Sequence, residues 1–371
     1  MKNIIADVKS IFVERDEEID AIGRAILARQ HVAMLGAPGI AKSALVREFC
    51  SRIIGAKYFQ RLLRRDSTTD EVFGPVSLKG LEQDSYRRNI SGKLPEAHLG
   101  FGDEGFKCNS TLLNGLLDII NERTFENDGA QVKCPLWSFF VASNELPQSE
   151  DLAPFWDRLL VRIVVRDIQE DSAFLRFLEA KSGRGMAALA GPWITVPLAE
   201  IERQQAETAA VDIPTDVNQQ IVRLRRDLHA EGIRPSPRRF AACLEYLKAA
   251  AYLDGRNEVA VDDIPVLADC LWEKPDQLPK LAQILGQLAS PELGRVMEIF
   301  DAAKEAADKA LAGKDAQVLL ESNSKLQKAY KELDKIAKSA SGKAKGKAEA
   351  AMKQIKGWNA EILKGIGIAT L

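Results

Sequence analysis

Two polar residues, Lys42 and Ser43, follow a glycine-proline-glycine turn and begin a segment with helical spacing. A short apolar run precedes the turn, so strand, tight turn and helix are predicted in succession over 32–49. Backbone N–H groups of such a turn converge on one point, and the helix N-terminus adds partial positive charge. A lysine there can reach the outer phosphates of a nucleotide, and a serine hydroxyl can ligate Mg²⁺. The pattern favours a nucleotide site over an ordinary strand-turn-helix corner.

Nine consecutive residues form the predicted phosphate loop: Gly36, Ala37, Pro38, Gly39, Ile40, Ala41, Lys42, Ser43 and Ala44. The usual pattern is G-x-x-x-x-G-K-[ST], and Ala41 stands where that pattern has its second glycine. Alanine has the smallest side chain that could replace glycine there, so the assignment is kept.

An acidic pair, Asp103 and Glu104, follows a short segment that contains two glycines. We expect Asp103 to hold the Mg²⁺ shell and Glu104 to orient and polarise the attacking water. Glycine weakens the predicted strand, and the pair by itself could be surface acid. Its place after a phosphate loop, in an α/β pattern, favours the catalytic interpretation.

Asn144 stands just past a continuous apolar strand predicted over 136–142. A polar side chain at the end of a buried strand is suited to position water beside a γ-phosphate. A simple turn asparagine is the alternative.

The elements that must position these residues alternate between strand and helix in the first half of the chain. A strand is predicted at 58–63, an amphipathic helix from Asn109 or Ser110 to about 123, and a hairpin over 125–132. This order indicates an α/β core with a parallel sheet. The polar stretch 81–95 is predicted as a surface loop or hairpin, either a substrate contact or a solvated charge run.

From about 167 the β pattern weakens and helices dominate, and we expect an all-α lid over 169–275 after a core over 1–168. Residues 276–371 are expected to form a helical hairpin or bundle. Its apolar positions follow a seven-residue repeat: Leu319, Leu326, Tyr330, Leu333 and Ala337. The lysine-rich tract 338–347 is predicted to be a flexible, solvated linker.

Bulk properties narrow the class of protein. The 371 residues are 46% hydrophobic and carry a formal net charge of -2, which gives no general attraction to nucleic acid or anionic membrane. The five cysteines lack metal-ligand or disulfide spacing, and no apolar run is long enough to span a bilayer. A cytoplasmic protein with reduced thiols is therefore expected, and a DNA motor is disfavoured.

The ordered motifs resemble the MoxR family of AAA+ ATPases over about 14–166. They are GAPGIAKS at 36–43, DE at 103–104, NERTF at 121–125, ASNELP at 142–147 and DR at 157–158. FGPVS at 73–77 and SGKLPEA at 91–97 make the RavA branch of that family the most similar.

The resemblance implies ATP and Mg²⁺ as ligands and assigns roles to three further residues. Asn144 would be the first sensor, and Arg158 the arginine finger that reaches a neighbouring subunit, with Arg162 as the competing candidate. Arg238 would be the second sensor at the start of a lid helix, with Arg239 facing elsewhere. The sequence departs from the family at Gly102 and Gly105, where bulky apolar residues are usual, which suggests a less rigid arm for Glu104.

The resemblance also implies a homo-oligomer, expected to be a hexameric ring, that couples ATP hydrolysis to remodelling or activating a partner protein. The expected partner is a protein with a von Willebrand factor A domain. A scaffold that assembles on nucleotide and hydrolyses little is the alternative, based on the glycine-flanked strand.

Overall fold

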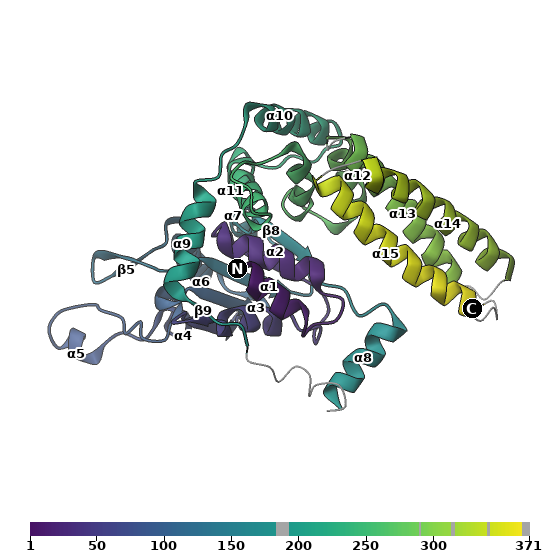
Figure 1. Ribbon diagram of the computed structural model, residues 1–371. Helices are drawn as coiled ribbons and strands as arrows, with labels where there is room; N and C mark the ends of the chain where they lie inside the picture. Colours follow the sequence, from purple (N-terminus) through teal and green to yellow (C-terminus); the bar gives the residue numbers. More distant parts are fainter. Residues whose placement is uncertain (183–192, 289–290, 313–315, 340–341, 366–371) are drawn as a thin grey trace. The chain divides into compact units, whose positions relative to one another are not determined.

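The computed structural model describes residues 1–182, 193–288, 291–312, 316–339 and 342–365 (Figure 1). The chain forms two compact units, which are described separately. Unit 1 comprises Met1–Pro214, Ile233–Val259 and Val266–Leu278, and unit 2 comprises Thr215–Gly232, Ala260–Pro265 and Pro279–Leu371.

A parallel sheet lies at the centre of unit 1. Its strands, in spatial order, are β3 (Tyr58–Leu62), β4 (Leu99–Asp103), β7 (Ser138–Ser143), β1 (Val32–Leu35) and β8 (Val161–Val164). Leu62 pairs with Asp103, and Leu35 pairs with Ser143. Because parallel strands end at one edge, the residues that follow β1, β4 and β7 meet there. The predicted parallel-sheet α/β core is confirmed.

The helices of unit 1 precede, connect or follow the strands of this sheet in the chain. They are α1 (Lys2–Lys9), α2 (Asp16–Leu27), α3 (Lys42–Ser51), α4 (Thr69–Phe73), α5 (Leu78–Leu81), α6 (Ser110–Glu122), α7 (Ala153–Arg158), α8 (Asp171–Lys181), α9 (Leu198–Ala209) and α11 (Pro237–Leu253). Short 3₁₀ turns are η1 (Leu94–Glu96), η2 (Gly105–Lys107), η3 (Glu150–Leu152) and η6 (Pro275–Gln277); the residues of η5 (Val261–Asp269) are divided between the two units.

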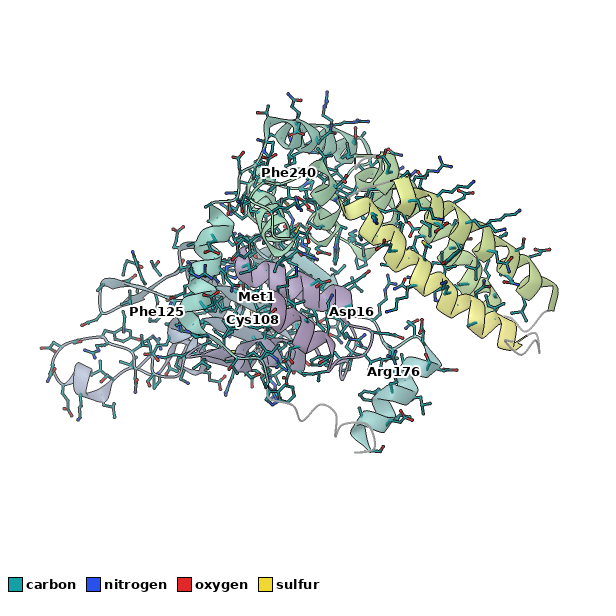
Figure 2. The ribbon with its side chains drawn as sticks, in the orientation of Figure 1. Met1, Asp16, Cys108, Phe125, Arg176 and Phe240 are labelled. Carbon is teal, nitrogen blue, oxygen red and sulfur yellow. The ribbon has the colours of Figure 1, made fainter. Side chains whose placement is uncertain are left out.

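Two local predictions in the middle of unit 1 are confirmed. Asn109 caps α6, since its Oδ1 accepts a hydrogen bond from the Leu112 N–H at 2.9 Å. The hairpin consists of β5 (Thr124–Asn127) and β6 (Ala130–Lys133), with positive φ at Asp128 and Gly129 as a tight hairpin turn requires. Phe125 on this hairpin, labelled in Figure 2, stacks on Phe73. Two short strands, β2 (Ile53–Ile54) and β9 (Val196–Pro197), form a separate parallel pair.

An arginine of α2 holds the lid helix α11 within unit 1. Arg24 donates from Nε to Tyr246 Oη and from Nη2 to Asp269 Oδ2, both at 2.9 Å. The Tyr246 hydroxyl also donates to Asp269, at 2.6 Å. The buried Tyr246 hydroxyl and the two partly buried charged groups satisfy one another, which gives the lid segment a fixed orientation on α2.

Unit 2 contains α10 (Thr215–Ala230), most of α12 (Leu278–Leu288) and a bundle of α13 (Pro291–Ala312), α14 (Ala316–Ser339) and α15 (Gly342–Gly365). Figure 1 shows the three long helices side by side. Four residues of the predicted seven-residue repeat are buried in the core of this bundle, and the fifth, Tyr330, packs against it. The buried members of the bundle core are Val296, Ala303, Ala307, Ala310, Leu319, Leu326, Leu333, Ala337, Ala348, Ala351, Ile355 and Ile362. The predicted C-terminal helices are confirmed.

The prediction of a flexible linker over 338–347 is wrong for most of its length. Helix α14 continues to Ser339 and α15 begins at Gly342, while residues 340–341 lie outside the described residues. Alanine and lysine are strong helix formers, and the buried side chains of Ala344 and Ala348 fix the first turns of α15.

The predicted domain boundaries at 168 and 275 remain predictions. The two compact units are divided at other positions, and each contains several separate segments of the chain. The five cysteines are free thiols, four of them buried, as expected for thiols that pack as small apolar groups. Within the described residues, no helix combines the length and the apolar character needed to cross a membrane.

Candidate active site

The phosphate loop joins β1 to α3 at the carboxyl edge of the sheet. The Gly36 N–H donates to Ser143 O at 3.0 Å, which fixes the start of the loop to β7. A Cβ on Gly36 would lie 2.4 Å from Val165 O, so this position accepts only glycine. Ala41 has φ +68°, the left-handed conformation for which the usual pattern has glycine. The loop therefore keeps the expected backbone path with alanine at that position.

Lys42 is buried at the first turn of α3 and faces the loop. Its Nζ donates to Gly36 O at 2.6 Å and to Ala37 O at 2.7 Å. Burial lowers the pKa of Lys42, and the negative charge of Asp103 raises it in part. The structure thus brings the predicted phosphate lysine and the predicted metal carboxylate together, although they are distant in sequence.

Asp103 ends β4, and Glu104 follows it in a left-handed conformation with φ +52°. The Glu104 N–H donates to Asp103 Oδ1 at 3.1 Å. The turn η2 then folds back, with the Lys107 N–H donating to Glu104 O at 2.9 Å and Lys107 Nζ to Glu104 Oε2 at 3.1 Å. A non-glycine residue in this conformation is strained, and such strain is concentrated at functional sites.

The space beside the two glycines that flank the acidic pair, Gly102 and Gly105, is filled by neighbouring side chains. A Cβ on Gly102 would lie 2.8 Å from Leu63 Cδ1 and 3.1 Å from Phe139 Cζ, and one on Gly105 would lie 2.5 Å from Val141 Cγ1. Strand β4 is also paired on both sides, with β3 and β7. The neighbours supply the bulk that the family usually places on this strand itself, so the packing does not indicate a soft arm for Glu104.

Asn144 follows β7 directly and is exposed at the same edge of the sheet. Two hydrogen bonds hold the turn around it: Ser143 Oγ donates to Glu145 O at 2.7 Å, and the Glu145 N–H donates to Ser143 Oγ at 3.1 Å. Its backbone is therefore fixed beside the phosphate loop. Its role as a sensor remains a prediction.

Arg158 ends α7 and is half-buried. It donates from Nη1 to Pro154 O at 2.7 Å and from Nε to Asn121 Oδ1 at the end of α6. Burial lowers the pKa of Arg158, and the positive charge of Arg238 lowers it further. The two arginines that the resemblance assigned to the nucleotide therefore lie close enough to interact.

The competing candidate, Arg162, is a structural residue of β8. Its side chain is 2% exposed, and its guanidinium lies 3.9 Å from the centre of the Trp156 ring. It donates to Trp156 O at 3.1 Å and to Trp272 O. Burial, with Arg239 nearby, lowers the pKa of Arg162 to about 8. A side chain enclosed in this way is held inside its own subunit, and the choice between Arg158 and Arg162 as the arginine finger remains a prediction.

Adjacent arginines at the start of α11 face different surroundings, as helical geometry predicts. Arg238 is exposed, whereas Arg239 is 2% exposed and donates to Cys270 O at 2.6 Å, Asp157 O at 3.0 Å and Leu160 O at 2.5 Å. Ser236 caps the helix and donates to Asp157 at 2.9 Å. Arg239 thus fixes the helix that carries Arg238 to the end of α7.

The sequence did not predict the contacts that Lys107, Asn121 and Arg123 make around the site. Arg123 has φ +51° and donates to Leu136 O at 3.0 Å, Trp137 O at 3.3 Å and Arg29 O, so it closes α6 against the sheet. The spacing of Lys107, three residues after Glu104, was the signal in the sequence for an ion pair. Asn121 gave none, because Arg158 lies 37 positions away.

The donors present fit a magnesium nucleotide. Lys42 provides a cation beside loop N–H groups at a helix N-terminus, which suits phosphate. Ser43 provides a hydroxyl in the same turn, and Asp103 a carboxylate near Lys42, which together suit a hard divalent cation. The Glu104 carboxylate, 45% exposed, is accessible to water.

Comparison with known proteins places the phosphate loop and the acidic pair within a MoxR domain, followed by a lid domain. Residues 1–187 match the family model "MoxR domain in the MoxR-vWA-beta-propeller ternary systems", and residues 216–285 match an AAA lid domain. Two Methanocaldococcus jannaschii proteins, MJ0812 and MJ0079, are 37% and 36% identical over 299 residues, which is 80% of this chain and 78% and 77% of theirs. The crystal structure of a candidate ATPase from Cytophaga hutchinsonii has the same fold, with a TM-score of 0.62 at 16% identity over 77% of this chain and 92% of its own.

Proposed function

The chain belongs to the MoxR family of AAA+ ATPases, and from that premise we propose that it hydrolyses ATP to ADP and phosphate, with Mg²⁺ as the metal. The observation that carries the proposal is the convergence of Lys42, Asp103 and Glu104 at one edge of the sheet. A phosphate-binding cation, a metal carboxylate and a general base are the groups that phosphoryl transfer to water requires.

In this proposal each residue has one task. Lys42 and the loop N–H groups bind the outer phosphates, and Ser43 and Asp103 hold Mg²⁺, which neutralises charge on the phosphate oxygens. Glu104 accepts the proton of the attacking water, and Asn144 holds that water in line. Arg238 contacts the phosphates from the lid helix of the same chain.

We further propose that Arg158 acts on the nucleotide of a neighbouring subunit in a homo-oligomer, expected to be a hexameric ring. Its support is the position at the end of α7, half-buried and close to Arg238, while Arg162 is enclosed. Within its own chain the Arg158 side chain donates hydrogen bonds to Asn121 and Pro154. These hydrogen bonds must break before Arg158 can reach a neighbouring subunit.

The partner that we propose is a protein with a von Willebrand factor A domain, which this ATPase would remodel or activate. The family model that matches 1–187 is described by systems of MoxR, vWA and β-propeller components. A cytoplasmic location, a chaperone-like role and closeness to the RavA branch belong to the same proposal. We do not propose nucleic acid as a partner, because the net charge is only -2.

The alternative is a scaffold that binds nucleotide, assembles and hydrolyses little. Its basis was a soft strand before Glu104, and the packing of Gly102 and Gly105 against their neighbours weakens that basis. Phosphate release by the purified chain, measured with and without a vWA-domain protein, separates the two. Hydrolysis that rises with the partner supports the remodelling ATPase; assembly on ATP without turnover in either sample supports the scaffold.

A further inference from the structure

Lys107 forms an ion pair with the residue proposed as the general base. Its Nζ lies 3.1 Å from Glu104 Oε2, and the two side chains are 41% and 45% exposed. An exposed ion pair of this kind contributes at most about 1 kcal/mol to folding. A contribution to folding stability therefore does not explain the ion pair. Its effect is on the position of the Glu104 carboxylate.

The backbone that carries Lys107 is fixed independently of the ion pair. The Lys107 N–H donates to Glu104 O at 2.9 Å, and Gly105 packs on Val141. The Phe106 side chain is buried, with its ring edge-on to those of Phe155 and Trp156 at centroid distances of 6.4 and 5.6 Å. Cys108, which follows Lys107 and is labelled in Figure 2, donates from Sγ to Gly105 O at 3.2 Å. The lysine thus extends from a rigid turn.

The ion pair uses one carboxylate oxygen and leaves the other for water. Lys107 binds Oε2, so Oε1 remains as the acceptor of a proton. Glu104 has three side-chain torsions, and a base that is free to rotate spends much of its time away from the attacking water. A misplacement of about 1 Å can cost about 10²-fold in rate.

We propose that Lys107 is a positioning residue for Glu104: it binds Oε2 and thereby holds Oε1 in the orientation that accepts the proton of the attacking water. This inference rests on the proposed ATP hydrolysis.

The test compares kcat and KM of the full-length chain for Mg·ATP in three variants. Lys107→Met keeps the length of the side chain and removes its charge, so kcat should fall on the order of 10²-fold while KM stays within about twofold. Lys107→Arg restores a cation and should recover most of kcat. Lys133→Met, an exposed lysine on β6, is the matched control and should leave both constants unchanged.

A second comparison asks whether Lys107 acts through Glu104. In a Glu104→Gln background, Lys107→Met should lower the residual single-turnover rate no further, because residues that act as a unit are not additive. An unchanged or higher kcat in Lys107→Met, a loss confined to KM, or the same fold loss in both backgrounds would overturn the positioning role. A wild-type chain without any hydrolysis contradicts the proposed function as well, whereas an active wild type with an unaffected Lys107→Met contradicts only the role of Lys107.

Discussion

The ring of Phe139 on β7 lies against Gly100 on the neighbouring strand β4, where an added Cβ would come within 2.6 Å of Phe139 Cδ2. The same ring would meet a Cβ on Gly102 at 3.1 Å. One aromatic side chain thus fills the space above two glycines of the strand that leads to Glu104. The absence of a side chain at these two positions of β4 is a requirement of this packing, and β4, which ends at Asp103, is paired with a strand on each side.

Gly100→Ala should lower the free energy of unfolding by about 1–3 kcal/mol, because the added methyl group overpacks a filled interior. Urea denaturation of the variant and the wild type measures the difference. Gly286→Ala is the matched control: among the described residues outside its own helical turn, no atom lies within 4 Å of its Cβ position on α12, and alanine should stabilise a helix by up to about 1 kcal/mol. Equal stability of Gly100→Ala and wild type would contradict the packing described.

Ala41→Gly should stabilise the chain by about 0.5–1 kcal/mol. A side chain in the left-handed region costs about 1–2 kcal/mol, and the greater chain entropy of glycine offsets part of this gain. Ala44→Gly, three residues later inside α3, should destabilise the chain by about 1 kcal/mol. The two variants should therefore change the free energy of unfolding in opposite directions. Urea denaturation without nucleotide is the measurement, and a loss of stability in both variants would show that Ala41 is unstrained.

Lys42→Ala and Glu104→Gln should separate ATP binding from hydrolysis. Lys42 supplies charge-assisted hydrogen bonds of about 1.5–3 kcal/mol each, so its loss should weaken ATP binding by about 10²-fold or more. Glu104→Gln is nearly isosteric but cannot accept a proton, so binding should persist while kcat falls about 10²–10⁴-fold. Calorimetric titration with ATP and phosphate release measure the two effects. Unchanged affinity in Lys42→Ala would place the nucleotide elsewhere.

Arg158→Ala and Glu104→Gln subunits, each inactive alone, should recover hydrolysis when they are assembled together. A mixed interface pairs an intact Glu104 site with an intact Arg158 from the neighbour, and such fingers contribute on the order of 10³–10⁵ in rate. The activity of mixtures at varied ratio is the measurement, with co-assembly checked by differently tagged subunits. Mixed oligomers without recovery would rule out action between subunits.

His31 should make the folded state sensitive to acid. Its Nδ1 accepts from the Phe139 N–H at 2.9 Å and its Nε2 contacts Ile120 O at 2.8 Å, so the neutral ring, with its proton on Nε2, satisfies both partners. Burial, with the charge of Arg123 nearby, lowers the pKa of His31 from 6.5 to about 3. The unfolded chain therefore binds the proton first as the pH falls below 6.5. Stability that is complete above pH 6.5 is lost towards pH 3, by up to about 1.4 kcal/mol per pH unit.

The measurement for His31 is the free energy of unfolding at several pH values between 7 and about 4.5, in the wild type and in His31→Gln. Glutamine keeps hydrogen-bonding groups but does not titrate, so the variant should be less stable at neutral pH and should lose less stability as the pH falls. Parallel curves for the two proteins would assign the acid sensitivity to other groups.

The sequence by itself determined the features that depend on neighbours along the chain. The glycine-rich turn before Lys42 and Ser43, the start of α6 at Asn109 or Ser110 and the turn at Asp128 and Gly129 are set by backbone chemistry within a few residues. The alternation of strands and helices indicated a parallel sheet, and parallel strands bring Gly36, Asp103 and Asn144 to one edge. The seven-residue repeat around Leu326 and Leu333 likewise predicted the helices of unit 2, because apolar residues at that spacing share one face.

Only the tertiary structure decided between residues of the same type. Arg158 and Arg162 are only four positions apart in the sequence. The Arg162 guanidinium is enclosed by the Trp156 ring and by the carbonyl of Trp272, which lies 110 positions away, whereas Arg158 is half-buried. The glycines before Glu104 suggested a soft strand until Phe139 and Leu63 were found to fill their space. Burial and the identity of a partner depend on segments that are remote in sequence, so no local pattern contains them.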